Sequence, residues 1–365
     1  MEQIQIPFGM RDLILDECKK KRMLQEKIEQ IFDSYGYDEV MTPSVEFYST
    51  YLNAFDDVQE EDMFKFFDHK GKIIALHTDM TVPIARVCAT KFKEIKPPYR
   101  CRYTSNVYKV RKTFAGKRSE VTDCGIECIG MAKSNLEVLL CAIDVMESLH
   151  TQYTLEIGNV NVFKKACKAL NIPTDTLQSL IDNKSMVELK EYLDTLQLNK
   201  EAFDFFMELP FLSGDETVLD RALELSFVDG CKDTIQSLKQ LVKEIKAIKP
   251  DAKLTFDLGK VPHFEYYTGI IFEGFVENVG TSVLSGGRYD QLLKKFGNDM
   301  PACGFSVKLD YLLDVVNVEK ETKTILYYPL SKQEEAYKMA NELRKTKKVI
   351  CMMTDCENIQ IQEVE

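Results

Sequence analysis

The sequence predicts an α+β protein whose mostly antiparallel sheet is flanked by helices, and three observations support this fold class. Strand-like segments come in hairpin pairs and do not alternate strictly with helices. The stretch 160–249 is almost wholly helical in its hydrophobic period, which indicates an insertion between strands. The length of 365 residues exceeds that of one ordinary core and predicts two or three domains.

The part of the chain before the insertion should supply helices and several strands. Apolar residues at helical spacing stop near Gly36, and Pro83 stands in the first turn of a later helix, where proline is tolerated. Residues 56–62 are an acidic loop or helix start. The elements expected here are helices over 13–34, 79–90 and 134–150 and strands over 37–47, 63–67, 72–76, 99–112 and 120–130.

The part after the insertion should return to strands and end in a small β-α-β unit. The expected elements are strands over 252–261, 266–276 and 281–290, a helix over 305–316, and the unit formed by 324–329, 332–345 and 347–355. The expected domains are the first part of a core (1–158), a helical insertion (159–250), the second part of the core (251–320) and a short C-terminal α/β remnant (321–365).

Composition narrows the class of protein. The chain has 47 basic and 58 acidic residues and a net charge of −11, which lowers the expectation of nucleic-acid binding. It has no apolar run of the roughly 18 residues that a membrane helix needs, and its first residues lack a secretory pattern. We therefore expect a cytoplasmic protein. Eleven Cys and four His show no zinc spacing, so reduced, mostly buried thiols and no metal site are expected.

Common catalytic motifs are missing from the sequence. It contains no phosphate-binding Walker A sequence, no G-x-S-x-G and no H-E-x-x-H. A catalytic Cys–His pair remains open on spacing alone. We therefore assign no catalytic residue.

One segment reverses the overall sign of charge. Between Lys91 and Arg118 there are ten basic residues and one acid, Glu94. A site for an anion or a partner is one interpretation, and a solvated hairpin or an interface with an acidic neighbour is the other. The candidate patch consists of Arg102, Lys109, Arg111, Lys112, Lys117 and Arg118.

Two further segments suggest close packing or a pocket. The paired Gly286 and Gly287 indicate close approach of the backbone to a ligand or to another strand, or simply a tight turn. Tyr266 and Tyr267 are expected on opposite faces of one strand, so that one faces the core and the other can line a pocket.

Taken together, several segments resemble the core of class II aminoacyl-tRNA synthetases and, within that class, the histidyl branch. The resemblance covers roughly residues 5–315, with the insertion where this family has one. It implies the class II fold and a homodimer formed through the first motif. The segments that resemble the first, second and third class motifs are 36–46, 107–127 and 301–313. Those that resemble the two histidyl signatures are 266–273 and 286–293.

The resemblance also implies a pocket for histidine or a similar molecule. Carboxylates suit a ligand with a cationic α-amino group and imidazole N–H donors. Asp79 and Asp123 stand where the family has Glu and Gln, and the alternative is that these polar residues are left over in a repurposed cleft. The positions that would hold histidine are Asp79, Thr81, Asp123, Glu127, Tyr267 and Tyr289.

The chain departs from the synthetase pattern where arginines hold ATP. The second-motif arginine is Lys109, followed by Arg111 in place of an acid. The other three arginine positions hold Ser119, Pro262 and Tyr311. A guanidinium binds phosphate in a bidentate manner that serine, proline and tyrosine cannot reproduce, so loss of synthetase activity is expected.

A synthetase-like core without these arginines resembles a second family, the regulatory subunits of ATP phosphoribosyltransferase. The strings at 79–86 and 105–108 are also similar to that family, and only about 43 residues follow Thr322, too few for a full anticodon-binding domain. This resemblance implies a chain that has no catalytic activity and no cofactor of its own. It would activate a short-form catalytic subunit within a hetero-octamer and take part in feedback inhibition by histidine. Neither tRNA nor a membrane is expected as a partner. A divergent histidyl-tRNA synthetase and a stand-alone histidine sensor remain the alternatives.

Overall fold

The computed structural model describes residues 5–55, 60–111, 118–260, 266–316 and 322–364. The described residues before position 317 form one compact unit and those after it form another. Each unit is described by itself. The domain boundaries inside the larger unit stay a prediction.

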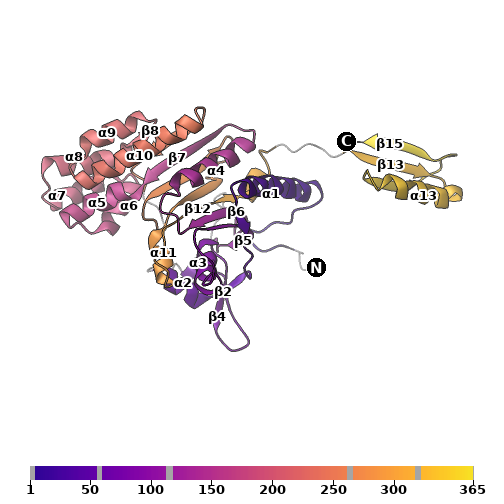
Figure 1. Ribbon diagram of the computed structural model, residues 1–365, viewed down its shortest axis with the longest axis horizontal. Helices are drawn as coiled ribbons and strands as arrows, with labels where there is room; N and C mark the ends of the chain where they lie inside the picture. Colours follow the sequence, from indigo (N-terminus) through magenta and orange to yellow (C-terminus); the bar gives the residue numbers. More distant parts are fainter. Residues whose placement is uncertain (1–4, 56–59, 112–117, 261–265, 317–321, 365) are drawn as a thin grey trace. The chain divides into compact units, whose positions relative to one another are not determined.

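The larger unit is built on one nine-stranded sheet (Figure 1). Only the pairs β1–β5 and β7–β9 are parallel, so the prediction of a mostly antiparallel sheet is confirmed. In spatial order its strands are β1 (Asp38–Glu39), β5 (Tyr99–Tyr108), β6 (Glu120–Ile129), β12 (Ala302–Lys308), β11 (Leu284–Arg288), β10 (Ile270–Val276), β7 (Tyr153–Asn159), β9 (Leu254–Asp257) and β8 (Ser213–Gly214).

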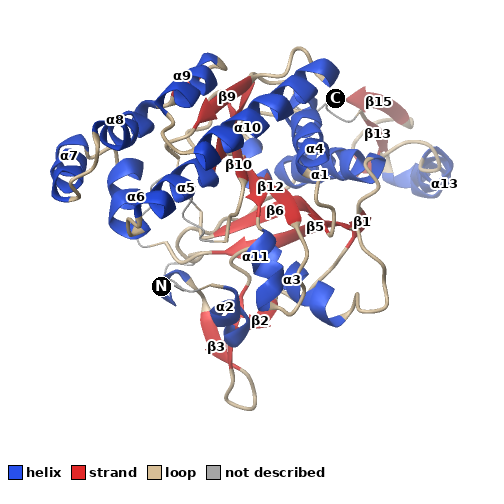
Figure 2. Ribbon diagram, turned by 60° about the vertical axis from the view of Figure 1, so that its left-hand side comes forward, coloured by secondary structure: helices blue, strands red, loops and turns tan. Residues whose placement is uncertain are grey.

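Helices α1 (Asp16–Ser34) and α4 (Asn135–Ser148) cover one face of this sheet, where α1 packs on β6 and α4 on β7 and β12 (Figure 2). The apolar side chains of β6 and β12 that face these helices alternate with polar ones that face away. Phe305 is paired with Ile126 and meets the ring of Phe32 from α1 edge-on, with centroids 5.7 Å apart. This face holds one of the hydrophobic cores of the unit.

The opposite face carries the polar side chains of the same strands. Glu127 is paired with Gly304, and Asp123 with Lys308, so these residues share one face. Helices α3 (Thr81–Thr90), α2 (Tyr48–Ala54) and α11 (Asp290–Lys295) pack together beside this face, and α11 contacts β12. Together with β5 these helices form a second cluster of buried apolar residues.

A second, three-stranded sheet lies next to α2. Its strands are β2 (Val45–Phe47), β4 (Ile73–Leu76) and β3 (Lys65–Phe67), all antiparallel, and Glu60–Asp62 forms a short 3-10 helix. The hairpin expected over 63–76 is confirmed. The strand expected over 37–47 is wrong in one respect, because it is split into β1 and β2 in different sheets. Pro43 lies between them and has no N–H to continue a ladder.

The insertion is helical as expected, with one exception. Its helices are α5 (Val160–Leu170), α6 (Thr174–Asp182), α7 (Met186–Thr195), α8 (Lys200–Glu208), α9 (Thr217–Leu225) and α10 (Asp229–Ile248), with a 3-10 turn over Leu209–Phe211. The exception is β8, which pairs with β9 and so ties the insertion to the edge of the main sheet.

One expected helix is largely a strand. The helix expected over 305–316 is wrong up to Lys308, because Ala302–Lys308 is β12 at the centre of the sheet, and only Leu309–Leu312 forms the short helix α12. The alternation of apolar and polar residues in β12 has the period of a strand, but seven residues followed directly by the apolar residues of α12 are too few to separate it from a helical pattern.

The smaller unit has its own core. The expected β-α-β arrangement is confirmed by β13 (Lys323–Tyr328), α13 (Gln333–Leu343) and β14 (Val349–Met353), with β13 and β14 parallel. A short 3-10 helix, Leu330–Lys332, precedes α13. A third strand that the sequence did not predict, β15 (Gln360–Val364), pairs antiparallel with β13.

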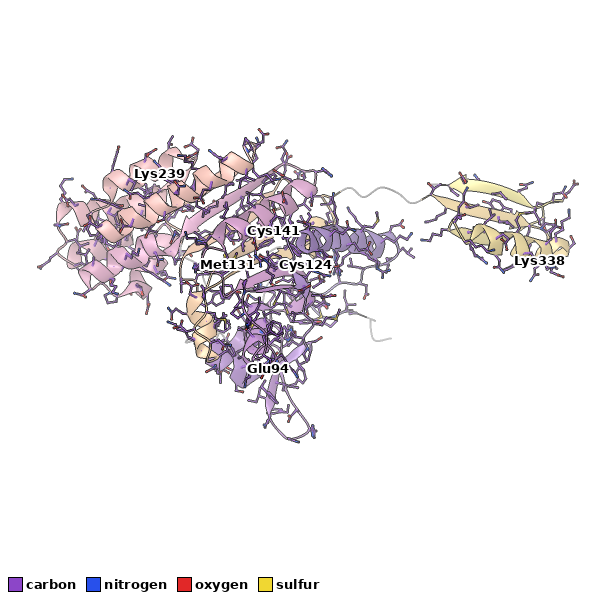
Figure 3. The ribbon with its side chains drawn as sticks, viewed as in Figure 1. Glu94, Cys124, Met131, Cys141, Lys239 and Lys338 are labelled. Atoms are coloured by element: carbon purple, nitrogen blue, oxygen red, sulfur yellow. The ribbon has the colours of Figure 1, made fainter. Side chains whose placement is uncertain are left out.

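The cysteines of both units are free thiols, as expected, and eight of the eleven are buried. Cys124 on β6 and Cys141 on α4 are examples (Figure 3), and burial raises the pKa of the Cys124 thiol to about 12. No helix in the described part of the chain combines the length and the apolar character needed to cross a bilayer.

The packing of α1 on the sheet predicts a large cost for truncating Phe32. Its side chain is fully buried against Phe305, so Phe32→Ala should lower the free energy of unfolding by about 3–5 kcal/mol. Met23 on the same helix is 36% exposed, and Met23→Ala should change it by less than about 0.5 kcal/mol. Urea denaturation measures both. Equal effects of the two substitutions would contradict this assignment of the core.

Candidate functional site

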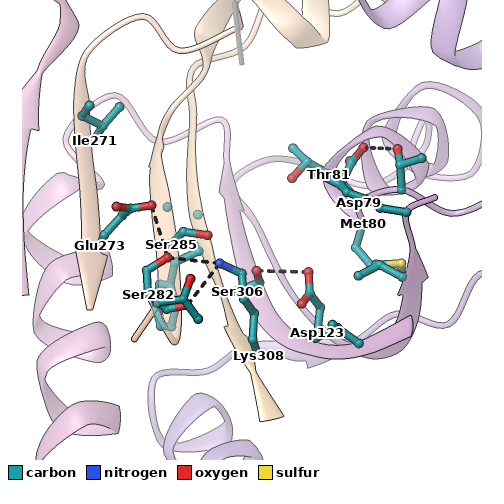
Figure 4. Close-up of a pocket in the computed structure, with 18 of the residues that line it drawn as sticks. Asp79, Met80, Thr81, Asp123, Ile271, Glu273, Ser282, Ser285, Ser306 and Lys308 are labelled. Carbon is teal, nitrogen blue, oxygen red and sulfur yellow. Dashed lines mark hydrogen bonds between the residues drawn. The ribbon is translucent and has the colours of Figure 1, made fainter. Parts of the chain in front are cut away.

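A cavity of about 610 Å³ opens on the polar face of the main sheet (Figure 4). Its walls come from β6, β10, β11 and β12 and from the segment that leads into α3. All six residues predicted for a histidine-like ligand line it, although they come from four separate parts of the chain. They are Asp79, Thr81, Asp123, Glu127, Tyr267 and Tyr289.

Glu127 lies at the buried end of the cavity. It accepts hydrogen bonds from the hydroxyl groups of Thr81 (2.9 Å) and Tyr289. Gly304, directly opposite on β12, leaves the room that this carboxyl occupies. Burial raises the pKa of Glu127 to about 8, so the group holds its proton at neutral pH.

Asp79 and Asp123 are the other two carboxyl groups predicted for the pocket. Asp79 accepts from the backbone N–H of Val82 (2.9 Å) in the first turn of α3, and burial raises its pKa. Asp123 accepts from the Ser306 hydroxyl (3.2 Å) through one oxygen, while its other oxygen, Oδ1, is buried and unpartnered. Burial raises the pKa of Asp123 to about 6.

The two adjacent tyrosines do not lie on opposite faces of a strand, so that prediction is wrong. The strand β10 begins only at Ile270, and both tyrosines precede it. Their ring centroids are 4.8 Å apart, and both rings line the cavity. Tyr266 also meets Tyr289 edge-on, at 5.9 Å between centroids. Tyr266 therefore adds a third ring to the two tyrosines, Tyr267 and Tyr289, that were predicted for the cavity.

The paired glycines of β11 are enclosed by protein atoms. A side chain at Gly287 would come within 2.6 Å of the Ile270 carbonyl oxygen and 2.7 Å of the Tyr267 ring. The close backbone approach expected here is therefore that of a neighbouring strand and an aromatic ring.

The structure separates the basic segment into two groups. Lys109, Arg111 and Arg118 line the cavity. Arg102 lies apart from them and forms an ion pair with Asp33 of α1 (2.7 Å), and Arg100 similarly pairs with Glu137 of α4 (2.9 Å). Lys112 and Lys117 lie outside the described residues.

Two cations of the cavity were not predicted from the sequence. Lys260 donates to Glu156 (2.7 Å) and to Glu273. Lys308 donates to the Ser282 hydroxyl (3.3 Å). The sequence pattern that could have placed Lys308 in the cavity is its spacing of two residues from Ser306 and four from Gly304. Three residues at this spacing share one face of a strand but not of a helix.

Two positions where synthetases carry arginine, Ser119 and Tyr311, line the cavity but bring no cation to it. Ser119 is buried against Gly9, whose carbonyl oxygen accepts from the Ser119 N–H (2.8 Å). The hydroxyl of Tyr311 accepts from the backbone N–H of Arg118 (3.4 Å). Pro262 lies outside the described residues. Two guanidinium groups, those of Arg111 and Arg118, nevertheless line the cavity.

Metal ligation has no candidate cluster in the part of the chain that the structure describes. No three His, Cys, Asp or Glu side chains there are placed to hold an ion. The chemistry that the arrangement offers is recognition of a charged small molecule by carboxyl groups, hydroxyl groups and cations.

The close approach of Glu127 to β12 predicts the effect of a methyl group at Gly304. The Cβ of Gly304→Ala would overlap the Glu127 carboxyl group and the Ile126 carbonyl oxygen, so we expect a loss of about 1–3 kcal/mol in unfolding free energy. Gly280 lines the same cavity with nothing within 4 Å of its Cβ position, and Gly280→Ala should be nearly neutral. Chemical denaturation of both variants tests this, and a neutral Gly304→Ala would refute it.

The raised pKa of Glu127 predicts how stability depends on pH. The folded chain keeps this proton up to about pH 8, whereas the unfolded carboxyl loses it near its ordinary pKa of 4.5. The contribution of Glu127 to stability is therefore complete below about pH 4.5 and is lost as pH rises toward 8. The free energy of unfolding of Glu127→Gln should therefore rise relative to that of the native chain by on the order of 1 kcal/mol for each pH unit within this window.

Unfolding free energies measured from pH 5 to pH 9 test the Glu127 prediction. The control is Glu277→Gln, since Glu277 is exposed just after β10 and its replacement should leave the pH profile parallel to that of the native chain. A Glu127→Gln profile that runs parallel to both would contradict the raised pKa.

The comparisons with known proteins agree with this architecture. The family model described as Histidyl-tRNA synthetase matches residues 9–312. A histidyl-tRNA synthetase structure from Nostoc sp. PCC 7120 shares the fold, with a TM-score of 0.78, 22% identity and coverage of 98% of this chain and 88% of its own.

The similarity in sequence is to regulatory subunits. A protein of Clostridium botulinum (strain 657 / Type Ba4) named ATP phosphoribosyltransferase regulatory subunit is 34% identical over 96% of this chain and 86% of its own. Another of that name, from Caldanaerobacter subterraneus subsp. tengcongensis, is 32% identical over 99% and 98%. A crystal structure named ATP phosphoribosyltransferase regulatory subunit/histidyl-tRNA synthetase, from Bacillus halodurans, has a TM-score of 0.85 and 28% identity over 97% and 94%. The chain thus belongs to the ATP phosphoribosyltransferase regulatory subunits, a family built on the histidyl-tRNA synthetase fold.

Proposed function

We propose that this chain is a non-catalytic cytoplasmic subunit that activates a short-form ATP phosphoribosyltransferase, joins it in a hetero-octamer and takes part in feedback inhibition by histidine. Membership of the family supports the regulatory role. The observation that carries the non-catalytic part is the state of the synthetase cavity. Its carboxyl groups are in place, but the arginine positions at 119 and 311 hold a buried serine and a tyrosine.

Ser119 and Tyr311 offer a phosphate no positive charge. A bidentate guanidinium stabilises the charge that develops on a transferred phosphoryl group, and each such contact contributes about 1.5–3 kcal/mol. Ser119 is enclosed by Gly9, and the Tyr311 hydroxyl faces a backbone N–H. Neither supplies a cation, so the rate of amino-acid activation should fall by orders of magnitude.

The carboxyl groups support histidine, or a similar molecule, as the ligand. Asp123 keeps one buried oxygen without a partner, and Asp79 lies on the same wall as Thr81. A cationic amino group or an imidazole N–H would satisfy the free oxygen. For such binding to regulate a catalytic subunit, histidine must bind the active and the inhibited assembly with different affinities.

The proposal includes a homodimer and excludes tRNA as a substrate. The segment that resembles the first class II motif, 36–46, carries the exposed apolar side chain of Met41 (81% exposed), and Phe47 (46%) follows it directly. Apolar side chains of this kind favour burial against a second copy.

A divergent histidyl-tRNA synthetase remains a second candidate for one reason. Arg111 and Arg118 line the cavity, so guanidinium groups are present there even though they do not stand at the family's positions. Histidine-dependent exchange between ATP and pyrophosphate would reveal this activity.

The test is reconstitution with a short-form catalytic subunit from the same genome. We expect a stable complex whose rate of phosphoribosyl transfer is at least tenfold above that of the catalytic subunit alone. Histidine should suppress this rate, by a factor in the range that is usual for allosteric coupling. Asp123→Ala should weaken suppression while leaving the complex intact, because Asp123 lies inside the cavity.

The control is Lys96→Gln, an exposed residue of the basic segment outside the cavity, which should behave as the native chain. The proposal fails if no complex forms or if the catalytic subunit is not activated. It also fails if the isolated chain sustains histidine-dependent ATP–pyrophosphate exchange.

A further inference from the structure

The smaller unit covers only one face of its three-stranded sheet with a helix. The core on that face is formed by side chains of β13, β14 and α13, namely Leu326, Tyr328, Val349, Ala336 and Ala340. Successive side chains of a strand point to opposite faces, so the residues between these core residues point away from α13 (Figure 1). The described residues of this unit contain no second α-helix to cover that other face.

A block of apolar side chains occupies the uncovered face. Ile325 of β13 is paired with Ile350 of β14, and Tyr327 is paired with Met352 further along the same two strands. Neighbouring strands lie about 4.8 Å apart, so these side chains form one contiguous patch, the apolar block. Ile350 and Met352 remain 42% and 46% exposed. The block is therefore apolar surface that the unit itself does not bury.

Amide and ammonium groups surround the apolar block. The register places Gln360 and Gln362 of β15 beside it. Lys323 begins β13 and Lys348 directly precedes β14, so the alternation puts both lysines at one end of this face. The open face is thus defined by Lys323, Ile325, Tyr327, Lys348, Ile350, Met352, Gln360, Gln362 and Val364.

None of the three strands places a carboxylate on the open face. The acid within β13, β14 and β15 is Glu363, which is paired with Thr324 on the α13 side of the sheet and forms an ion pair with Lys347. An ammonium group that is covered at an interface without an opposite charge costs free energy. A surface that covers the open face should therefore be apolar at its centre and carry carboxylates at the edge that meets Lys323.

Two other occupants match the open face less well. A second copy of the same face would bring amides and further lysines but no carboxylate. Single-stranded RNA is held by bases stacked on aromatic rings, and this face has a single ring, that of Tyr327, among aliphatic side chains. The charge and the apolar character together favour an acidic protein surface.

We propose that the open face docks the catalytic subunit, through a surface of that subunit that is apolar at its centre and acidic at one edge. This rests on the proposed function, which supplies the partner, and goes further by assigning the surface of contact. Burial of the apolar block provides affinity, and carboxylates that meet Lys323 orient the subunit. The contact weakens with salt, because salt screens such charges.

The first test compares methionine oxidation in the free full-length chain and in its complex with the catalytic subunit. Hydrogen peroxide converts accessible methionines to sulfoxides, which mass spectrometry locates. Met352 should react roughly fivefold more slowly in the complex, because an interface core excludes solvent. Met339 on α13, 38% exposed, and Met353, which points to the other side of β14, should keep their rates. An unchanged rate for Met352 overturns the proposal.

Substitutions with matched controls test the chemistry of the contact. Met352→Gln should weaken binding of the catalytic subunit roughly tenfold, and Met339→Gln should leave it unchanged. Lys323→Glu should weaken binding by a similar factor and reduce its salt dependence, whereas Lys338→Glu on α13 (Figure 3) should do neither. Calorimetry on full-length chains at low and high salt measures these affinities.

The two methionines are similarly exposed, so equal effects of Met352→Gln and Met339→Gln contradict docking at the open face. If a variant fails to fold, the oxidation rates of the native chain decide the question.

Other outcomes separate this proposal from the proposed function. Activation of the catalytic subunit with Met352 equally reactive in the complex overturns this inference alone, whereas the absence of any complex overturns both. Protection of Met352 in the chain alone at high concentration identifies a second copy as the occupant. Protection by single-stranded RNA and not by the catalytic subunit identifies RNA. Either result overturns the docking proposed here.

Discussion

The pairing of β6 with β12 is the constraint on which the site depends. The insertion and several other elements separate these strands in the sequence, yet their register sets Glu127 against Gly304 and Asp123 against Lys308. Because Gly304 has no side chain, the Glu127 carboxyl lies against the backbone of β12 and meets Tyr289. A slip of one residue would turn both carboxyl groups toward α1 and α4, so the hydrophobic packing on the other face also maintains the cavity.

Much of the fold was predictable because its signals are local. The hairpin of β5 and β6, the helix α3 and the helical insertion each show their own period. The main failure concerns a short segment, whose few residues do not separate the period of a strand from that of a helix. The sequence predicts a helix over the central strand β12, and that prediction hides the place of Lys308 and Ser306 in the site, since those two positions share a face only on a strand. Tyr266 was misplaced because β10 starts later than its residue pattern indicates.

The resemblance gave the positions of the six predicted pocket residues, and all of them line the cavity. It did not show which basic residues reach the cavity. The sequence groups Arg102 with Arg111, whereas the fold directs Arg102 toward the acids of α1 and leaves Arg111 in the cavity. Which cations meet a ligand depends on tertiary structure, and one of them, Lys308, comes almost two hundred residues after the basic segment. The retained carboxyl groups and the rearranged cations support our proposal of a cavity that binds a small molecule without activating it.

The position of the helical insertion has an evolutionary consequence. It leaves the sheet after β7 and returns through β9, and these two strands are parallel neighbours, with Leu155 paired to Leu254. Because the two strands are parallel, the insertion leaves at one end of the pair and the chain re-enters at the other, three or more strands away from β12 and β6. The lobe nevertheless reaches the site, since α6 contributes Asp182 to the cavity wall, so lineages that lengthen or trim it around α6 would also reshape that wall.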